Sequence, residues 1–424
     1  MIENSKRLKV ALYSLGCKLN QAELELMARD FTRAGYQVVS ASAEADIYVL
    51  NTCTVTHIAD RKSRQWLRFA RRKNPEALLV ATGCYAERAP EALNRLEGVN
   101  LVIGNAEKPG LVEIVDKYVG SPQFDHEDIA SASFADGLRT RTLVKVQDGC
   151  NNFCSYCIVP LTRGREVSLP VEMVIDEVKR RVAGGYKEVV LTGVKIGAYG
   201  YDGVALKGLI ERILAGTNVS RLRLSSLQPQ EISAGLVALW HEPRLCRHFH
   251  LSLQSGSDTV LTRMNRRYLT ADYRQMVALI CSVVPEAAIT TDIIAGFPGE
   301  TDAEFETGYA FAREMAFARI HVFAYSPRAG TKAALMPHPV PFGIKKERSE
   351  RLLALAGESA LSFRERFLGR EMTVLWEQEA GGNWSGLTDN YIRVYTASRD
   401  NLANRLTPVK LTAVYRDGVW GEVV

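Results

Sequence analysis

Three cysteines lie close together in the chain, at Cys150, Cys154 and Cys157, with the spacing C-x3-C-x2-C. A structural zinc site is normally closed by four protein ligands, so three thiolates fit it poorly. A cubane iron–sulfur cluster has four irons, and three cysteines would leave one iron open to another ligand. The spacing therefore indicates a [4Fe-4S] cluster whose open iron can hold a chelating small molecule. The alternative is a loop that binds zinc or has no redox role.

The composition indicates an ordinary globular chain of several domains. It has 424 residues, of which 46% are hydrophobic and 24% charged, and its net charge is +5. No segment is long and apolar enough to cross a membrane, and the first residues lack a signal-peptide pattern. We therefore expect a cytoplasmic protein with reduced thiols, whose eight cysteines are ligands or core residues and not disulfides. The charge permits a polyanionic partner without requiring one.

The first domain, residues 6–118, alternates short apolar runs with helical patterns. This alternation predicts an α/β fold with a parallel sheet covered by helices on both faces. We expect one helix capped by Asn20, a second that runs through Lys73, and a third near Pro90–Leu96. The expected strands are Lys9–Ser14, Ala45–Leu50 and Leu78–Thr82.

Each of these three strands is followed by a cysteine, namely Cys17, Cys53 and Cys84. The carboxyl ends of parallel strands meet at one edge of a sheet, where open α/β sheets bind their ligands. Three thiols brought to that edge can hold a second three-cysteine cluster. The alternative is that all three are small core residues, because free cysteine is often buried.

Residues 119–140 are polar and aperiodic, and are predicted to link the first domain to a second one over residues 141–367. The second domain repeats a strand–helix pattern six times, which predicts an open (β/α)6 barrel with chemistry at the carboxyl ends of its strands. A charged helix over Lys345–Arg370 leads into residues 368–424, whose short strand-like runs predict a small β-barrel. The six expected core strands are Leu143–Gln147, Glu188–Thr192, Arg221–Ser225, His248–Leu253, Ala288–Ile294 and Arg319–Phe323.

With both cysteine sets placed, the chain resembles the radical S-adenosylmethionine methylthiotransferases over essentially its whole length. Beyond the six cysteines, the matching segments are Thr82–Ala86, Ile158–Pro160 with Arg163–Gly164, Leu253–Ser257, Met264–Arg266, and Asp292–Ile294 running into Gly296–Thr301. The resemblance implies a methylthiotransferase domain, a radical core and a C-terminal TRAM β-barrel. Two positions depart from the family pattern: Leu169 stands where arginine is usual, and Lys195 where Asn or His is common.

The resemblance also implies the cofactors and their sites. The two cysteine sets would each hold a [4Fe-4S] cluster, and the core would bind S-adenosylmethionine; no catalytic group beyond these ligands is implied. Tyr156 would contact the adenine, and Thr192 with Gly193 would receive the methionine amino group. Ser226 and Gln254 would bind the carboxylate or the ribose. Each of these five residues can instead be an ordinary capping or turn residue.

The substrate implied is tRNA with threonylcarbamoyladenosine at position 37, because Gly16–Gln21 and Asn51–Thr56 look most like that branch. The alternatives are isopentenyladenosine at the same position and an aspartate of a ribosomal protein. A threonylcarbamoyl group carries a carboxylate, which a buried cation would meet. Arg163 and Lys195, each expected near a strand end of the core, are candidates for that cation.

A basic helix is the second candidate contact with tRNA. Arg61, Arg64, Arg68, Arg71 and Arg72 recur at helical spacing, and Lys62 and Lys73 lie among them. Such a stripe can neutralise phosphates, or it can be a solvated helix face. The expected partners are tRNA and a flavodoxin- or ferredoxin-like electron donor, with no membrane. A different class of protein, a two-cluster electron carrier without catalysis, would explain the cysteines but not the other motifs.

Overall fold

The computed structural model describes residues 7–120 and 140–424, which divide into two compact units. The first unit holds residues 7–120 together with Gly149–Asn151 and Cys157–Arg165. The second holds residues 140–148, Asn152–Tyr156 and Glu166–Val424. Nearly all of the expected linker, residues 121–139, lies outside the described residues. The expected radical core and C-terminal barrel lie in one unit, and the cysteine loop contributes residues to both units.

The first unit is built on a five-stranded parallel sheet in the order β2-β1-β3-β4-β5. The strands β3 and β4 are buried along their whole length, as expected for central strands covered on both faces. All three expected strands form, with boundaries that shift by one or two residues. The strands are β1 (Lys9–Ser14), β2 (Gln37–Val39), β3 (Ile47–Thr52), β4 (Leu78–Gly83) and β5 (Leu101–Ile103).

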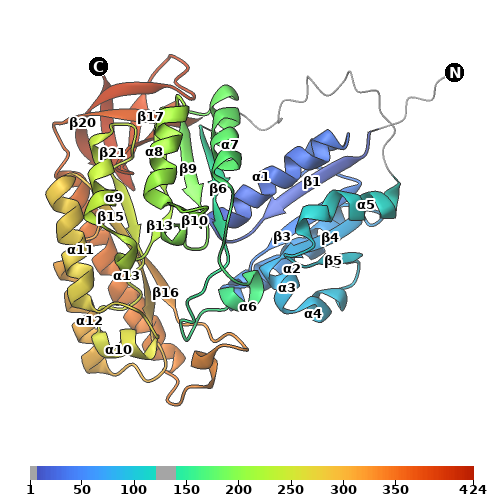
Figure 1. Cartoon of the computed structure of the whole chain (residues 1–424), viewed down its shortest axis with the longest axis horizontal. Coiled ribbons are helices and arrows are strands. Elements are labelled where there is room, and N and C mark those ends of the chain that lie inside the picture. Colours follow the sequence, from blue (N-terminus) through green and yellow to red (C-terminus); the bar gives the residue numbers. More distant parts are fainter. Residues whose placement is uncertain (1–6, 121–139) are drawn as a thin grey trace. The chain divides into compact units, whose positions relative to one another are not determined.

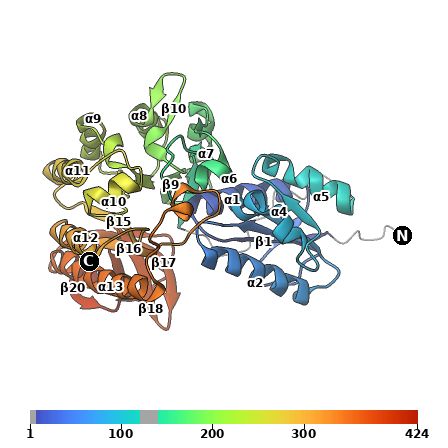
Figure 2. The ribbon, with the colours of Figure 1, turned by 90° about the horizontal axis from the view of Figure 1, so that it is seen from below.

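Helices cover both faces of this sheet, as Figure 2 shows for α2 and α5 on opposite sides of β1. One face packs Phe31 of α1 and Val115 of α5 against the strands, and the other packs Leu67 of α2 and Leu93 of α4. The expected cap at Asn20 is wrong, because α1 begins at Lys18 and its N-cap is Cys17. The helices are α1 (Lys18–Arg33), α2 (His57–Lys73), α3 (Cys84–Arg88), α4 (Pro90–Asn94), α5 (Leu111–Val119) and, from the cysteine loop, α6 (Val159–Arg163).

The core of the second unit has six main parallel strands, several of which are labelled in Figure 1. They form two sheets, β12-β9-β6 and β13-β14-β15-β16, and the short strand β13 (Ser226–Leu227) continues β12 after Ser225. This confirms the expected α/β core. The six strands are β6 (Arg141–Lys145), β9 (Glu188–Thr192), β12 (Arg221–Leu224), β14 (His248–Leu251), β15 (Ala288–Ala295) and β16 (Arg319–Ala324).

The helices of the core pack against one face of these strands. Leu209 and Ile210 of α8 and Ile280 of α11 are fully buried in the same apolar cluster as Phe249 and Ile289 of the strands. The α12 helix begins with a capping box between Thr301 and Glu304. The helices are α7 (Val171–Ala183), α8 (Leu206–Gly216), α9 (Ala234–Val237), α10 (Asp258–Arg263), α11 (Thr270–Val283), α12 (Asp302–Glu314) and α13 (Phe342–Glu365).

The C-terminal strands close into a small barrel in the order β17-β18-β19-β21-β20. This confirms the expected barrel, although the sequence missed β18, which follows the turn at Gly381 and Gly382. Trp376 is fully buried inside and its indole N–H donates to the Thr407 hydroxyl. The barrel strands are β17 (Glu371–Ala380), β18 (Asn383–Thr388), β19 (Arg393–Ala397), β20 (Leu406–Tyr415) and β21 (Gly418–Val423). Outside the barrel, two short antiparallel pairs join β7 (Gln147–Asp148) to β8 (Val167–Ser168) and β10 (Gly200–Tyr201) to β11 (Val204–Ala205).

Candidate functional site

The cysteines of the first unit follow three neighbouring strands at the same edge of the sheet. Cys53 and Cys84 come directly after the ends of β3 and β4, and Cys17 comes three residues after the end of β1; these strands are adjacent in the sheet. A side-chain carbon placed on Gly16 would lie 2.5 Å from the Cys53 Sγ, so the chain at Gly16 passes directly against that thiol. Gly16 has a φ of +98°, which also favours glycine. The sheet therefore gathers the three thiols as the strand pattern predicted.

A positively charged network surrounds Cys84. The Nε of Arg163 donates to the Cys84 Sγ at 3.2 Å, and its Nη1 pairs with Glu23 at 2.9 Å. The Nζ of Lys108 pairs with the same carboxylate at 2.8 Å. Two buried basic side chains therefore share one carboxylate, and burial lowers the pKa of Lys108. Basic groups beside Cys84 fit the negatively charged ligand set of an iron–sulfur cluster.

The placement of Arg163 corrects an expectation. We expected it near a strand end of the radical core, but it belongs to α6 in the first unit, where its side chain is 3% exposed. Its Nη2 also donates to Asn20 Oδ1 at 2.6 Å. The sequence could not indicate this, because α6 and α1 are far apart along the chain.

The Cys53 thiol is held in its neutral form by its surroundings. Burial, together with smaller contributions from the neighbouring Cys17 and Cys84 thiols, raises its pKa to about 12. A thiol with this pKa is protonated at pH 7. Metal binding here must therefore release a proton, as is usual for buried cysteine ligands.

The C-x3-C-x2-C loop begins with a tight turn at Gly149. A side-chain carbon there would lie 1.9 Å from the carbonyl oxygen of Arg165, and Gly149 has a φ of +65°. The backbone N–H of Cys150 donates to the Gly164 carbonyl at 3.1 Å, which fastens this end of the loop. In the second unit, Arg266 Nη1 donates to the Cys154 Sγ at 3.3 Å. Each of these two cysteines is therefore held by a specific contact.

The residues expected to bind S-adenosylmethionine lie at or just beyond the carboxyl ends of the core strands. Thr192 ends β9, and a side-chain carbon on Gly193 would lie 2.8 Å from the Gln147 carbonyl oxygen. Ser226 starts β13. Gln254 follows β14 with a φ of +69°, and its N–H donates to the Asp292 carbonyl at 2.8 Å. This edge is where a (β/α) barrel places its chemistry.

Tyr156 packs near the same edge. Its ring meets Phe297 edge to face, with 6.5 Å between the ring centroids. The same small apolar cluster contains Ile294 near the end of β15. Ile294 also donates its N–H to the Gln254 carbonyl at 2.9 Å, so Tyr156 and Gln254 flank a shared residue.

Lys195 lies between two carboxylates. Its Nζ is 3.1 Å from Glu166 Oε1 and 3.5 Å from Glu231 Oε1, and its side chain is 12% exposed. Burial raises the pKa of Glu231. Glu231 therefore takes up a proton more readily than an ordinary glutamate. An anion that approaches Lys195 favours this uptake of a proton by Glu231.

The basic helix α2 divides into structural and exposed cations. Arg64 Nη1 donates to the Tyr85 hydroxyl at 2.8 Å, and Arg71 binds the carbonyls of Pro75 and Gly98. The remaining cations are exposed; these are Arg61, Lys62, Arg68, Arg72 and Lys73, and we call them the basic face of α2.

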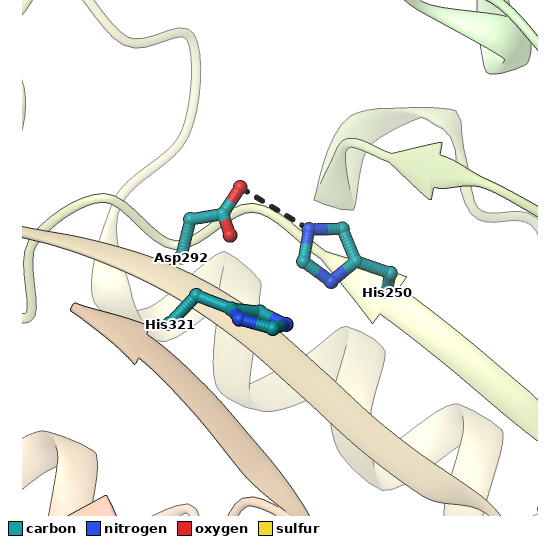
Figure 3. Close-up of side chains that lie close together, drawn as sticks. All are labelled: His250, Asp292 and His321. Atoms are coloured by element: carbon teal, nitrogen blue, oxygen red, sulfur yellow. Dashed lines mark hydrogen bonds and ion pairs between the residues drawn. The ribbon is translucent and has the colours of Figure 1, made fainter. Parts of the chain in front are cut away.

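Sequence reasoning missed a group of three side chains in the core: His250, Asp292 and His321 (Figure 3). They come from the neighbouring strands β14, β15 and β16. The available signal was weak, since it consisted only of polar residues at alternate positions of strands that were otherwise apolar.

Known proteins match the chain over nearly its whole length. The threonylcarbamoyladenosine tRNA methylthiotransferase of Bacillus subtilis is 35% identical over 98% of this chain and 97% of its own. That of Thermotoga maritima is 39% identical over 91% of this chain and 90% of its own. The tRNA-2-methylthio-N(6)-dimethylallyladenosine synthase of Geobacter metallireducens is 36% identical over 97% of both chains.

Two family descriptions match parts of the chain, and a solved structure has a similar fold. Residues 9–104 match the uncharacterized protein family UPF0004, and residues 144–312 match the radical SAM superfamily. The radical S-adenosylmethionine methyltransferase TsrM of Kitasatospora setae has a similar fold, with a TM-score of 0.55 and 16% identity over 74% of this chain and 72% of that chain. The core is therefore a radical S-adenosylmethionine domain, which uses S-adenosylmethionine and a [4Fe-4S] cluster.

The similar relatives show to which family of radical S-adenosylmethionine enzymes the chain belongs. Because they are at least 35% identical over almost the full length of both chains, the protein belongs to the radical S-adenosylmethionine methylthiotransferase family. It is accordingly an enzyme that transfers methylthio groups. Within residues 7–120 and 140–424, no helix is both long and apolar enough to cross a membrane.

Proposed function

We propose that this enzyme converts N6-threonylcarbamoyladenosine at position 37 of tRNA to its 2-methylthio derivative. The observation that carries the proposal is the similarity to four relatives named for this reaction, at 35–39% identity over 91–98% of the chain. Relatives named for the dimethylallyl substrate reach 32–36%. These ranges overlap, so the segments Gly16–Gln21 and Asn51–Thr56 are a necessary second support.

We further propose that the two cysteine sets hold two [4Fe-4S] clusters. Cys150, Cys154 and Cys157 hold the one that meets S-adenosylmethionine, and Cys17, Cys53 and Cys84 hold the other. When bound, these groups supply a 5′-deoxyadenosyl radical and the sulfur to be transferred. The contact of Arg163 with the Cys84 sulfur supports this assignment, because a buried guanidinium there can offset part of the negative charge of a thiolate-ligated cluster.

The chain's own residues then bind and position the small molecules. Tyr156, Thr192, Gly193, Ser226 and Gln254 are proposed to hold S-adenosylmethionine, since they occupy one edge of the core. The basic face of α2 is proposed to contact tRNA phosphates, with Arg64 at its border. The electron donor is proposed to be a flavodoxin- or ferredoxin-like protein, in the cytoplasm. The domain limits of 6–118, 141–367 and 368–424 remain part of the proposal.

Lys195 is proposed to meet the carboxylate of the threonylcarbamoyl group. The substrate carboxylate would compete with Glu166 and Glu231 for its ammonium group. The raised pKa of Glu231 makes this exchange easier, because a protonated Glu231 leaves Lys195 with one anionic partner fewer. An isopentenyl group is apolar and offers Lys195 no such exchange.

The test compares activity on tRNA bearing each of the two modifications, with the product nucleoside measured by mass spectrometry. We expect turnover of the threonylcarbamoyl substrate and a selective loss of it in Lys195→Ala. Lys207→Ala is the matched control, because Lys207 pairs with Glu211 on the surface of α8. Preferred turnover of the isopentenyl substrate would refute the substrate assignment. If S-adenosylmethionine and dithionite produced no 5′-deoxyadenosine at all, the electron-carrier alternative would be favoured.

A further inference from the structure

The polar residues of β14, β15 and β16 lie on the face of the core that is turned away from the helices. On β14, Phe249 and Leu251 belong to the apolar cluster beneath the helices, so His248 and His250 point to the opposite face. The same alternation holds on β15, where Ile289 and Ile293 join that cluster and Asp292 does not. His321 alternates in the same way with Ile320 of β16. Four side chains with metal-binding atoms thus share one face, and three of them, His250, Asp292 and His321, lie close together.

The strand register brings these three side chains together. Asp292 is paired with His321, and His250 is paired with Thr290, two residues before Asp292. His250 Nε2 lies 3.2 Å from Asp292 Oδ2, and the two imidazole rings have centroids 5.9 Å apart. One potential ligand atom from each of the three residues lies within 4.8 Å of the others (Figure 3).

A second layer of hydrogen bonds fixes the orientation of His250. Its Nδ1 lies 3.0 Å from the Thr290 hydroxyl, which in turn lies 3.1 Å from His248 Nε2. The ring is therefore held by one nitrogen while the other, Nε2, faces Asp292. Metal-binding histidines are typically held in this manner, because the second contact fixes the tautomer and the ring plane.

We propose that His250, Asp292 and His321 bind one divalent first-row transition-metal ion, separate from both iron–sulfur clusters. Two imidazoles and one carboxylate suit zinc or ferrous iron better than calcium or magnesium, which prefer oxygen ligands. Ligand bonds of about 2.0–2.1 Å place the donor atoms of a tetrahedral zinc roughly 3.3 Å apart, so small side-chain rotations complete the site. Three protein ligands leave a coordination position open to water or to an oxygen of a bound molecule.

The competing explanation is a plain histidine–aspartate hydrogen bond. Such a pair needs only His250 and Asp292, whereas here a donor atom of His321 also lies within 4.8 Å of theirs. Asp292 is also partly open, with a side-chain exposure of 26%, so an ion can enter without breaking the core. The convergence of three donors from three strands is what favours a metal.

The experiment uses the reconstituted enzyme with its clusters, exposed to one equivalent of zinc and freed of excess by gel filtration. We expect about one tightly held zinc per chain and an iron content that zinc does not change. His321→Ala and Asp292→Asn should each weaken zinc binding at least tenfold and keep the iron. Asp292→Asn preserves side-chain size and so guards against simple misfolding. His241→Ala, an exposed histidine of the same unit, is the matched control.

X-ray absorption at the zinc edge identifies the ligands independently of activity. We expect nitrogen and oxygen neighbours at about 2.0–2.1 Å and no sulfur near 2.3 Å. Sulfur neighbours would show that zinc occupies cysteines and would overturn the proposal. So would the absence of retained zinc in the wild type, or equal retention in wild type and His321→Ala.

Discussion

Replacing Gly16 with alanine should remove the cluster proposed for the first unit without disturbing the core. The new methyl carbon would lie 2.5 Å from both the Cβ and the Sγ of Cys53, whereas ordinary contacts are 3.4–4 Å. Cys53 must therefore move by about 1 Å, and a binding constellation tolerates only about 0.5 Å. The φ of +98° adds about 1–2 kcal/mol of backbone strain for a residue other than glycine.

The magnitude follows from the number of clusters proposed. Two [4Fe-4S] clusters contain about eight irons, so Gly16→Ala should retain about four. Methylthio transfer should be lost, while cleavage of S-adenosylmethionine to 5′-deoxyadenosine persists. Iron analysis and nucleoside mass spectrometry on the same preparation measure both effects.

Gly110→Ala is the matched control for this change. Gly110 lies in the same unit with a φ of −93°, and nothing lies within 4 Å of an added side-chain carbon. This variant should keep all of its iron and its activity. If Gly16→Ala also kept about eight irons and full transfer, Cys53 would not be a cluster ligand and the reasoning would be wrong.

Three further predictions concern the cysteines, the basic face and the buried charges. Alanine at any cysteine of the C-x3-C-x2-C loop should remove about four irons and abolish 5′-deoxyadenosine formation. Alanine at Cys17 or Cys84 should also remove about four irons, but cleavage of S-adenosylmethionine to 5′-deoxyadenosine should persist. Unchanged iron in the Cys17 and Cys84 variants would contradict the two-cluster proposal. The exposed arginines of the basic face are Arg61, Arg68 and Arg72. Replacing all three should weaken tRNA binding and reduce the slope of the logarithm of the tRNA binding constant against the logarithm of the salt concentration by about 2–3. An unchanged slope would show that the basic face of α2 is an ordinary solvated helix face. Arg223→Met should destabilise the fold by about 3–5 kcal/mol in chemical denaturation, because Glu188, 0% exposed, would lose its pairing with Arg223 at 2.7 Å and keep a longer one to Arg221 at 4.0 Å. The double variant with Glu188→Met should recover part of that loss, and no recovery would show that the charge pair is not the cause.

The sequence alone determined the main parallel strands and the spacing of the six cysteines, but it did not indicate β2, β5 or β18. Buried parallel strands appear as continuous apolar runs, and this local signal placed β1, β4 and β9 within a residue of their observed bounds. A cysteine that directly follows such a strand must lie at its carboxyl end. For that reason the edge that holds Cys17, Cys53 and Cys84 was predictable before any side-chain contact was known.

The tertiary structure decided which charged and polar groups meet. Arg163 and Cys84 are 79 residues apart, and no local pattern connects them. Lys195 looked like a lone cation in the sequence, yet the fold gives it two carboxylates. His250 and Asp292 are likewise 42 residues apart and meet only because β14 and β15 pair in one register. The period of apolar residues and the spacing of cysteines are properties of a single segment. The partners of a side chain depend instead on the order and register of strands that are far apart along the chain.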